Sequence, residues 1–99
     1  MTISNARIIR APGAGAVEIL QRRMPQAVRD RIKSLRIDAI GLLQSSVVDI
    51  LYFADVAQKA SAVFPVELHG SCPQHITTLA LLGDVSAVET AMRAIELCR

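Results

Sequence analysis

The chain has 99 residues, of which 52% are hydrophobic and 3% aromatic, and its formal net charge at pH 7 is +2. A chain of this length forms a single domain that buries only about two thirds of its unfolded surface, so we expect part of its large apolar content to contact a partner. Charged residues interrupt each apolar stretch before it reaches the roughly 18 residues that a membrane helix needs. Arg7 and Arg10 stand where a signal peptide would be apolar, so we expect a cytosolic protein without membrane contact.

Residues 2–15 have little helical pattern, and Ile3, Ile8 and Ile9 lie among polar residues, which predicts an exposed strand. Exposed strands need pairing. We therefore expect an N-terminal extension over residues 1–15, followed by one domain over residues 16–99. A disordered tail is the alternative, since terminal residues often stay loose.

Residues 16–35, AVEILQRRMPQAVRDRIKSL, are predicted to form a strand, a basic corner and a short helix. Basic residues dominate positions 22–36, where Asp30 is the one acid. Such a cluster can bind nucleic acid by releasing counterions from phosphate, but so few aromatic residues offer no stacking platform for bases. The stronger interpretation is a solvated helix face with Val28, Ile32 and Leu35 turned inward, and no nucleic-acid partner.

Residues 37–46 form an apolar run that contains Gly41 and predicts a strand. Residues 47–62 follow with apolar side chains at three- and four-residue spacing, which is typical of an amphipathic helix. The apolar positions of this helix are Ile50, Phe53, Ala54, Ala57 and Ala60. Ser46 and Asp49 stand three apart at the junction, where a hydroxyl can accept a hydrogen bond from a free helical N–H.

Residues 69–75 contain His69, Cys72 and His75 at a spacing that metal ligands can have. A tetrahedral site needs a fourth ligand, and only the distant Cys98 remains, so we expect neither a metal nor a cofactor. A small secreted domain would more often carry a set of disulfides, so Cys72 and Cys98 are expected to be free thiols.

Residues 75–82 predict another strand, Gly83-Asp84 a turn with a capping carboxylate, and residues 85–99 a second amphipathic helix. In order, the predicted elements are strand, strand, helix, strand, helix, strand, strand and helix. This order indicates an α+β fold, in which a mostly antiparallel sheet is covered on one face by the two alanine-rich helices.

Three segments resemble the bacterial microcompartment (BMC) shell domain: DAIGLL at 38–43, ADVAQKA at 54–60 and LLGDVSAVETAMRAI at 81–95. In that family the chain usually continues past the last of these helices into one more strand and a short helix, whereas this sequence stops at Arg99. Residues 16–35 are similar to the usual end of a shell subunit, so the order resembles the circularly permuted shell proteins of the EutS and PduU type. The resemblance implies a ferredoxin-like BMC fold, circularly permuted, with an N-terminal strand extension.

The resemblance also implies site residues. In that family the loop between the second and third strands lines the central pore of a hexamer, and the corresponding residues here are Gly70, Ser71, Cys72, Pro73 and Gln74. Lys59 matches the lysine of the hexamer edge, where neighbouring hexamers tile. Its companion arginine follows the last strand in a short proline-containing motif, which QRRMP resembles, so that Arg22 or Arg23 would be the companion. The N-terminal segments of six subunits would form a small barrel over the pore.

The expected function is therefore that of a structural shell subunit, not an enzyme. Homohexamers would tile with other shell proteins around enclosed enzymes in the bacterial cytoplasm and gate the passage of metabolites. Catalysis is not expected, because the sequence has no phosphate-binding glycine loop and nothing orients His69 or His75 as a base for Cys72. The alternative is a small ferredoxin-like regulatory domain that binds a ligand between the subunits of a dimer or trimer. Oligomer size separates the two hypotheses.

Overall fold

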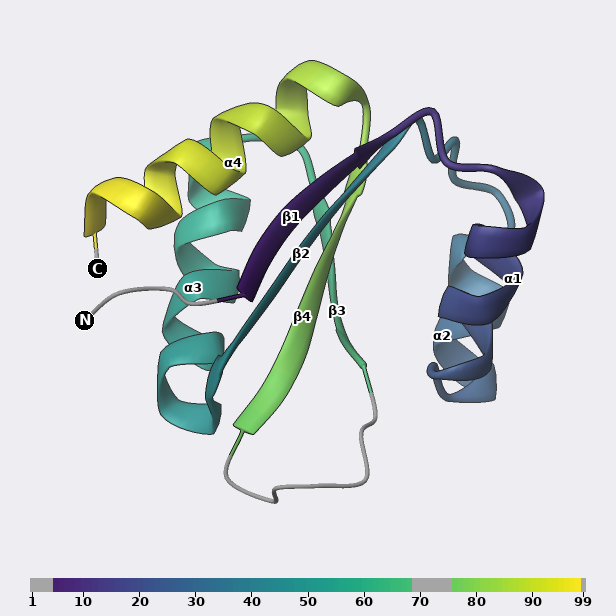
Figure 1. The fold of residues 1–99 in the computed structure, drawn as a ribbon, viewed down its shortest axis with the longest axis horizontal. Helices are drawn as coiled ribbons and strands as arrows, with labels where there is room; N and C mark the ends of the chain where they lie inside the picture. The colour runs from purple at the N-terminus through teal and green to yellow at the C-terminus, as the bar shows by residue number, and fades with distance from the viewer. Residues whose placement is uncertain (1–4, 69–75, 99) are drawn as a thin grey trace.

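The computed structural model describes residues 5–68 and 76–98, which form one antiparallel sheet and four helices (Figure 1). The elements are β1 (Asn5–Arg10), α1 (Ala14–Arg22), α2 (Gln26–Ile32), β2 (Ala39–Ser46), α3 (Val47–Ala60), β3 (Phe64–Leu68), β4 (Ile76–Gly83) and α4 (Val85–Cys98). The strands lie in the order β1-β2-β4-β3, and every neighbouring pair is antiparallel. The predicted α+β fold is confirmed.

Helices cover both faces of the sheet, α3 and α4 on one face and the α1–α2 pair on the other (Figure 1). Side chains of the central strands alternate between the two faces: Leu79 and Leu81 pack under α3 and α4, while Ala80 and Leu82 pack toward α1 and α2. Because both faces are covered, the central strands contain continuous apolar runs, over residues 39–43 and 79–82. The predicted cover of one face by the two alanine-rich helices is confirmed.

The α3–α4 layer packs closely because small residues lie at its contacts. Ala57 and Ala91 are fully buried there. Gly41 on β2 faces α4 so closely that a Cβ atom at this position would lie 2.9 Å from Met92 Sδ and 3.1 Å from Val88 Cγ1. The glycine is therefore needed for the close approach of α4 to β2.

Both long helices begin at the capping residues that the sequence predicts. The Ser46 hydroxyl accepts a hydrogen bond from Asp49 N at 3.2 Å, and Asp84 Oδ1 accepts one from Ala87 N at 2.7 Å. Each cap satisfies a backbone N–H that has no partner within its helix.

The strand predicted within residues 16–20 is wrong, because these residues lie in α1. Leu20 and Met24 are one turn apart and both are buried against the sheet with Ile32 of α2. Val17 and Ile19 favour a strand, but only a helix brings both Leu20 and Met24 onto the sheet. Burial of these side chains contributes more free energy than the local strand preference. The basic corner is the end of this helix. On α2, the Arg31 guanidinium lies 5.1 Å from the centroid of the Phe64 ring.

The N-terminal strand β1 is the edge of the main sheet. It pairs with β2 over its whole length, from Asn5 opposite Gln44 to Arg10 opposite Ala39. A strand is thus present in this segment, but it pairs within the subunit. The barrel of six N-terminal segments, and the boundary between an extension at 1–15 and a domain at 16–99, stay predictions. No helix in the described ranges is long and apolar enough to cross a membrane.

Candidate functional site

Lys59 lies in the last turn of α3 and extends into solvent, with 76% of its side chain exposed. Its Nζ lies 2.8 Å from Asp55 Oδ2, one turn earlier. The hydrogen bond and the negative charge of Asp55 raise the pKa of Lys59 above its ordinary value. An exposed pair of this kind contributes little to stability, and the lysine can exchange Asp55 for another acceptor at small cost.

Arg22 and Arg23 lie at the end of α1. Arg22 forms an exposed ion pair with Glu18 at 3.1 Å, and the backbone N–H of Arg23 donates to Leu20 O at 3.0 Å. The end of α1 points away from the end of the sheet where α3 finishes (Figure 1). Neither arginine is therefore brought together with Lys59, and neither follows a strand.

Arg10 does lie at the end of a strand and before a proline. It is the last residue of β1, and Pro12 is two residues later. Between them, Ala11 has a φ of 49°, a left-handed conformation that residues other than glycine rarely adopt, and its N–H donates to Asp38 O at 2.9 Å. Arg10 lies opposite Ala39, at the same end of the sheet where β3 begins after α3. The sequence signal for this residue was the Arg-Ala-Pro step directly after Ile8-Ile9.

The guanidinium of Arg10 is bound to α4. Its Nε donates to Glu89 Oε2 at 3.1 Å, and its Nη2 donates to the same oxygen. Among the described ion pairs, this one joins elements from the two ends of the chain, whereas the others join residues at most four apart. The pair fixes the arginine over the edge of the sheet.

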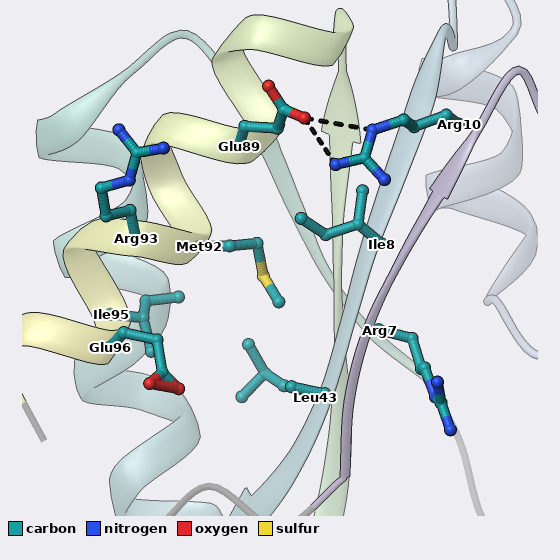
Figure 2. A pocket seen from close by; sticks show the side chains of 10 residues that line it. Arg7, Ile8, Arg10, Leu43, Glu89, Met92, Arg93, Ile95 and Glu96 are labelled. Atoms are coloured by element: carbon teal, nitrogen blue, oxygen red, sulfur yellow. Dashed lines mark hydrogen bonds and ion pairs between the residues drawn. The ribbon is translucent and has the colours of Figure 1, made fainter.

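An open groove of 630 Å³ lies between β1 and α4, next to this ion pair (Figure 2). Its floor is apolar and consists of Ile8, Leu43, Met92 and Ile95. Its rim is charged and consists of Arg7, Arg10, Glu89, Arg93 and Glu96. Figure 2 shows Arg10 and Glu89 joined at one end, while Arg7 and Arg93 point away from the floor. We call this feature the β1–α4 groove.

A second exposed apolar feature lies on the outer side of α3. Val48, Leu51 and Tyr52 are exposed by 76%, 69% and 54%. They lie opposite the core-facing residues Ile50 and Phe53 of the same helix. We call these three residues the α3 stripe. No sequence motif indicated a role for these three residues.

The predicted pore residues Gly70 to Gln74 lie outside the described residues, together with His69 and His75. Within the described ranges, no three His, Cys, Asp or Glu side chains gather in a way that could hold a metal ion. Cys98 is exposed and free, and its thiol donates to Ala94 O at 3.2 Å. The pore loop and the expected absence of a metal stay predictions.

Comparison of the chain with known proteins identifies a family and several similar structures. The BMC domain model matches residues 39–97, which are more than half of the chain. The chain is 43% identical to the ligand-free GrpU microcompartment shell protein from Pectobacterium wasabiae, with a TM-score of 0.77 over 93% of this chain and 99% of that one. For GrpU from Clostridiales bacterium 1_7_47FAA, the identity is 32% and the TM-score 0.69, over 94% and 88% of the two chains.

A more distant structure shows the fold alone. The trimeric bacterial microcompartment shell protein PduB is 22% identical, with a TM-score of 0.57 over 93% of this chain and 37% of that one. None of the curated proteins compared with the chain matches it.

Proposed function

Because the chain belongs to the BMC domain family of bacterial microcompartment shell proteins, we propose that it is a structural subunit of a microcompartment shell in the bacterial cytoplasm. The observation that carries the proposal is the 43% identity to the Pectobacterium wasabiae shell protein over 93% of this chain. The architecture agrees with such a role, since the exposed apolar side chains of α3 and the open β1 edge are surfaces that an assembly would cover.

The subunit is circularly permuted in this proposal. The family model begins at Ala39, the first residue of β2, yet β1 and the α1–α2 pair precede it. β1 pairs with β2 and completes the sheet from the N-terminal side. This pairing supports the expectation that the N-terminal third supplies the strand and helix with which a standard shell subunit ends.

The assembly unit is a homohexamer that tiles with other shell proteins around enclosed enzymes. The loop at residues 70–74 would face the six-fold axis and gate the passage of metabolites, and Lys59 would lie at the hexamer edge. The strand register supports this radial arrangement. Leu68 and Ile76, which flank the loop, are at one end of the sheet, while Arg10 and the end of α3 are at the other. The same register favours Arg10 over Arg22 or Arg23 as the companion of Lys59.

The solution mass of the purified chain tests the assembly unit. Native mass spectrometry at two concentrations is expected to give a species of six times 10.7 kDa. Electron microscopy of the same sample is expected to show flat sheets. A dimer or trimer would contradict the proposal and favour a regulatory ligand-binding domain.

We expect Lys59→Ala to weaken sheets while leaving hexamers intact, because the exposed side chain contributes little to its own subunit. Lys33→Ala is the matched control, since Lys33 is also an exposed lysine near the end of a helix, directly after α2, and is paired with Asp30 at 3.3 Å. The measurement is the protein concentration at which sheets appear in electron micrographs. Sheets that are unchanged in Lys59→Ala would remove this lysine from the hexamer edge.

We expect Arg10→Ala, and not Arg22→Ala, to prevent sheets. Arg10 lies at the same end of the sheet as the end of α3, and Arg22 lies at the far end of α1. Glu89→Gln controls for the loss of the Arg10–Glu89 ion pair within the subunit. If Arg22→Ala alone abolishes sheets in the same assay, the arginine of QRRMP is the companion of Lys59 after all.

A further inference from the structure

We propose that neighbouring subunits contact head to tail, with the α3 stripe of one copy seated in the β1–α4 groove of the next. This inference rests on the proposed ring and names the surfaces that build it. It assigns a second copy of this chain as the occupant of the groove.

The two surfaces lie at opposite edges of the sheet. α4 contacts β1 and β2, and the groove opens at the β1 edge. α3 contacts β2, β4 and the edge strand β3, so the stripe is on the helix that lies nearer the other edge. Two different surfaces at opposite edges of one subunit form a heterologous contact when they pair, and such contacts generate rings if the rotation closes.

The stripe is a second apolar face on a helix that already has one. Ile50, Phe53 and Ala57 of α3 fill the core of the subunit. A helix that has solvent on its other side is normally polar there, yet the first two turns of α3 expose Val48, Leu51 and Tyr52. Contiguous apolar side chains in these turns are typical of an interaction surface.

The groove is incomplete without a neighbour. Its floor leaves Ile8 and Met92 only partly buried. Beside it, β1 pairs on one side with β2 and has no partner strand on the other within the described residues. The opposite edge strand, β3, is protected by Pro65, whereas β1 contains no proline. The unprotected edge is thus the one that adjoins the apolar floor.

The charges around the two surfaces are complementary. The groove rim carries three arginines against two glutamates, and neither Arg7 nor Arg93 has a hydrogen-bond or ion-pair partner within the part of the chain that the structure describes. The stripe adjoins Asp49, which forms none of the described ion pairs, whereas Asp55 is already paired with Lys59. Opposite charges around an apolar centre steer association and fix the orientation of the partners.

Two variants, each with one surface disrupted, test the contact. Leu51→Glu places a charge in the stripe, and Arg7→Glu with Arg93→Glu reverses the groove rim. Each variant alone is expected to need at least a tenfold higher concentration than wild type to form rings in native mass spectrometry. Mixed in equal amounts, the two variants are expected to form 1:1 dimers, because each retains the one surface that the other has lost.

Ile19→Glu is the matched control, since Ile19 is an apolar residue of α1 with 58% exposure and belongs to neither surface. It is expected to form rings like wild type. Circular dichroism verifies the fold of each variant, and Val48→Glu replaces Leu51→Glu if the latter unfolds.

The outcomes separate this inference from the proposed function. Hexamers that persist in both variants overturn the contact and leave the shell role intact. Wild-type rings of another size, with 1:1 dimers in the mixture, support the contact and contradict the hexamer. Rings restored by mixing would mean that the two surfaces do not pair with each other, and a wild-type chain that stays monomeric also overturns the inference.

Discussion

Replacing Leu81 by alanine is expected to lower the free energy of unfolding by about 3 kcal/mol. Leu81 is fully buried on the face of β4 that packs under α3 and α4. It lies opposite Gly41 on one neighbouring strand and Pro65 on the other, so it is in the middle of the sheet. The substitution removes apolar atoms from this layer and leaves a cavity that strands held on both sides cannot close.

Leu51→Ala is the matched control, because it is the same substitution at a position with 69% exposure. In a single subunit it should change the free energy of unfolding by less than about 0.5 kcal/mol. Urea denaturation at several protein concentrations measures both variants. An effect of Leu51→Ala that grows with concentration would reflect lost assembly, since assembly adds stability by mass action. If both variants lower the free energy of unfolding equally at the lowest protein concentration, the placement of Leu81 in the core is contradicted.

Local sequence patterns were sufficient for the C-terminal two thirds of the fold. The three- and four-residue spacing of Ile50, Phe53 and Ala57 identified α3, and Ser46 and Asp84 marked where the long helices begin. These signals are local, because a helix buries one face and its first N–H groups need caps within a few residues.

The N-terminal third depends on contacts that local patterns do not encode. Residues 16–20 contain the strand-favouring Val17 and Ile19, yet they are helical because Leu20 anchors α1 on the sheet beside α2. β1 pairs with a strand that begins 29 residues after β1 ends, from Arg10 to Ala39. No turn between the two strands fixes their register, so the edge position of β1 was not apparent from the sequence.

In the candidate site, too, local patterns predict some features, while others depend on contacts between distant parts of the chain. Lys59 lies outside the apolar positions that the helical period of residues 47–62 predicts, and in the structure its side chain is exposed. Its place at a hexamer edge stays a prediction. The β1–α4 groove joins residues from the two ends of the chain, and its ion pair links Arg10 to Glu89, 79 positions later. No spacing pattern in the sequence predicts a contact between residues that are so far apart along the chain. The Arg-Ala-Pro step marks Arg10 in the sequence, but the sheet register is needed to prefer it to the arginines of QRRMP.

Gly41→Ala is expected to lower the free energy of unfolding by about 2 kcal/mol, because it overpacks the contact between β2 and α4. The new Cβ would lie 2.9 Å from Met92 Sδ and 3.1 Å from both Met92 Cγ and Val88 Cγ1. Gly15→Ala is the control for the same substitution. Nothing lies within 4 Å of a Cβ at Gly15, which is in the first turn of α1. There the change should raise the free energy of unfolding by up to about 1 kcal/mol, since alanine favours a helix.

A double-mutant cycle with Met92→Ala identifies the cause of the loss at Gly41. Met92→Ala removes two of the three atoms that the new methyl group meets, so Gly41→Ala should cost at least about 1 kcal/mol less in that background than in wild type. Urea denaturation of the four proteins gives the coupling. A cost that is the same in both backgrounds would mean that Met92 does not set the distance between β2 and α4. In that case the glycine would be needed for the backbone of β2 itself, and not for the approach of the helix.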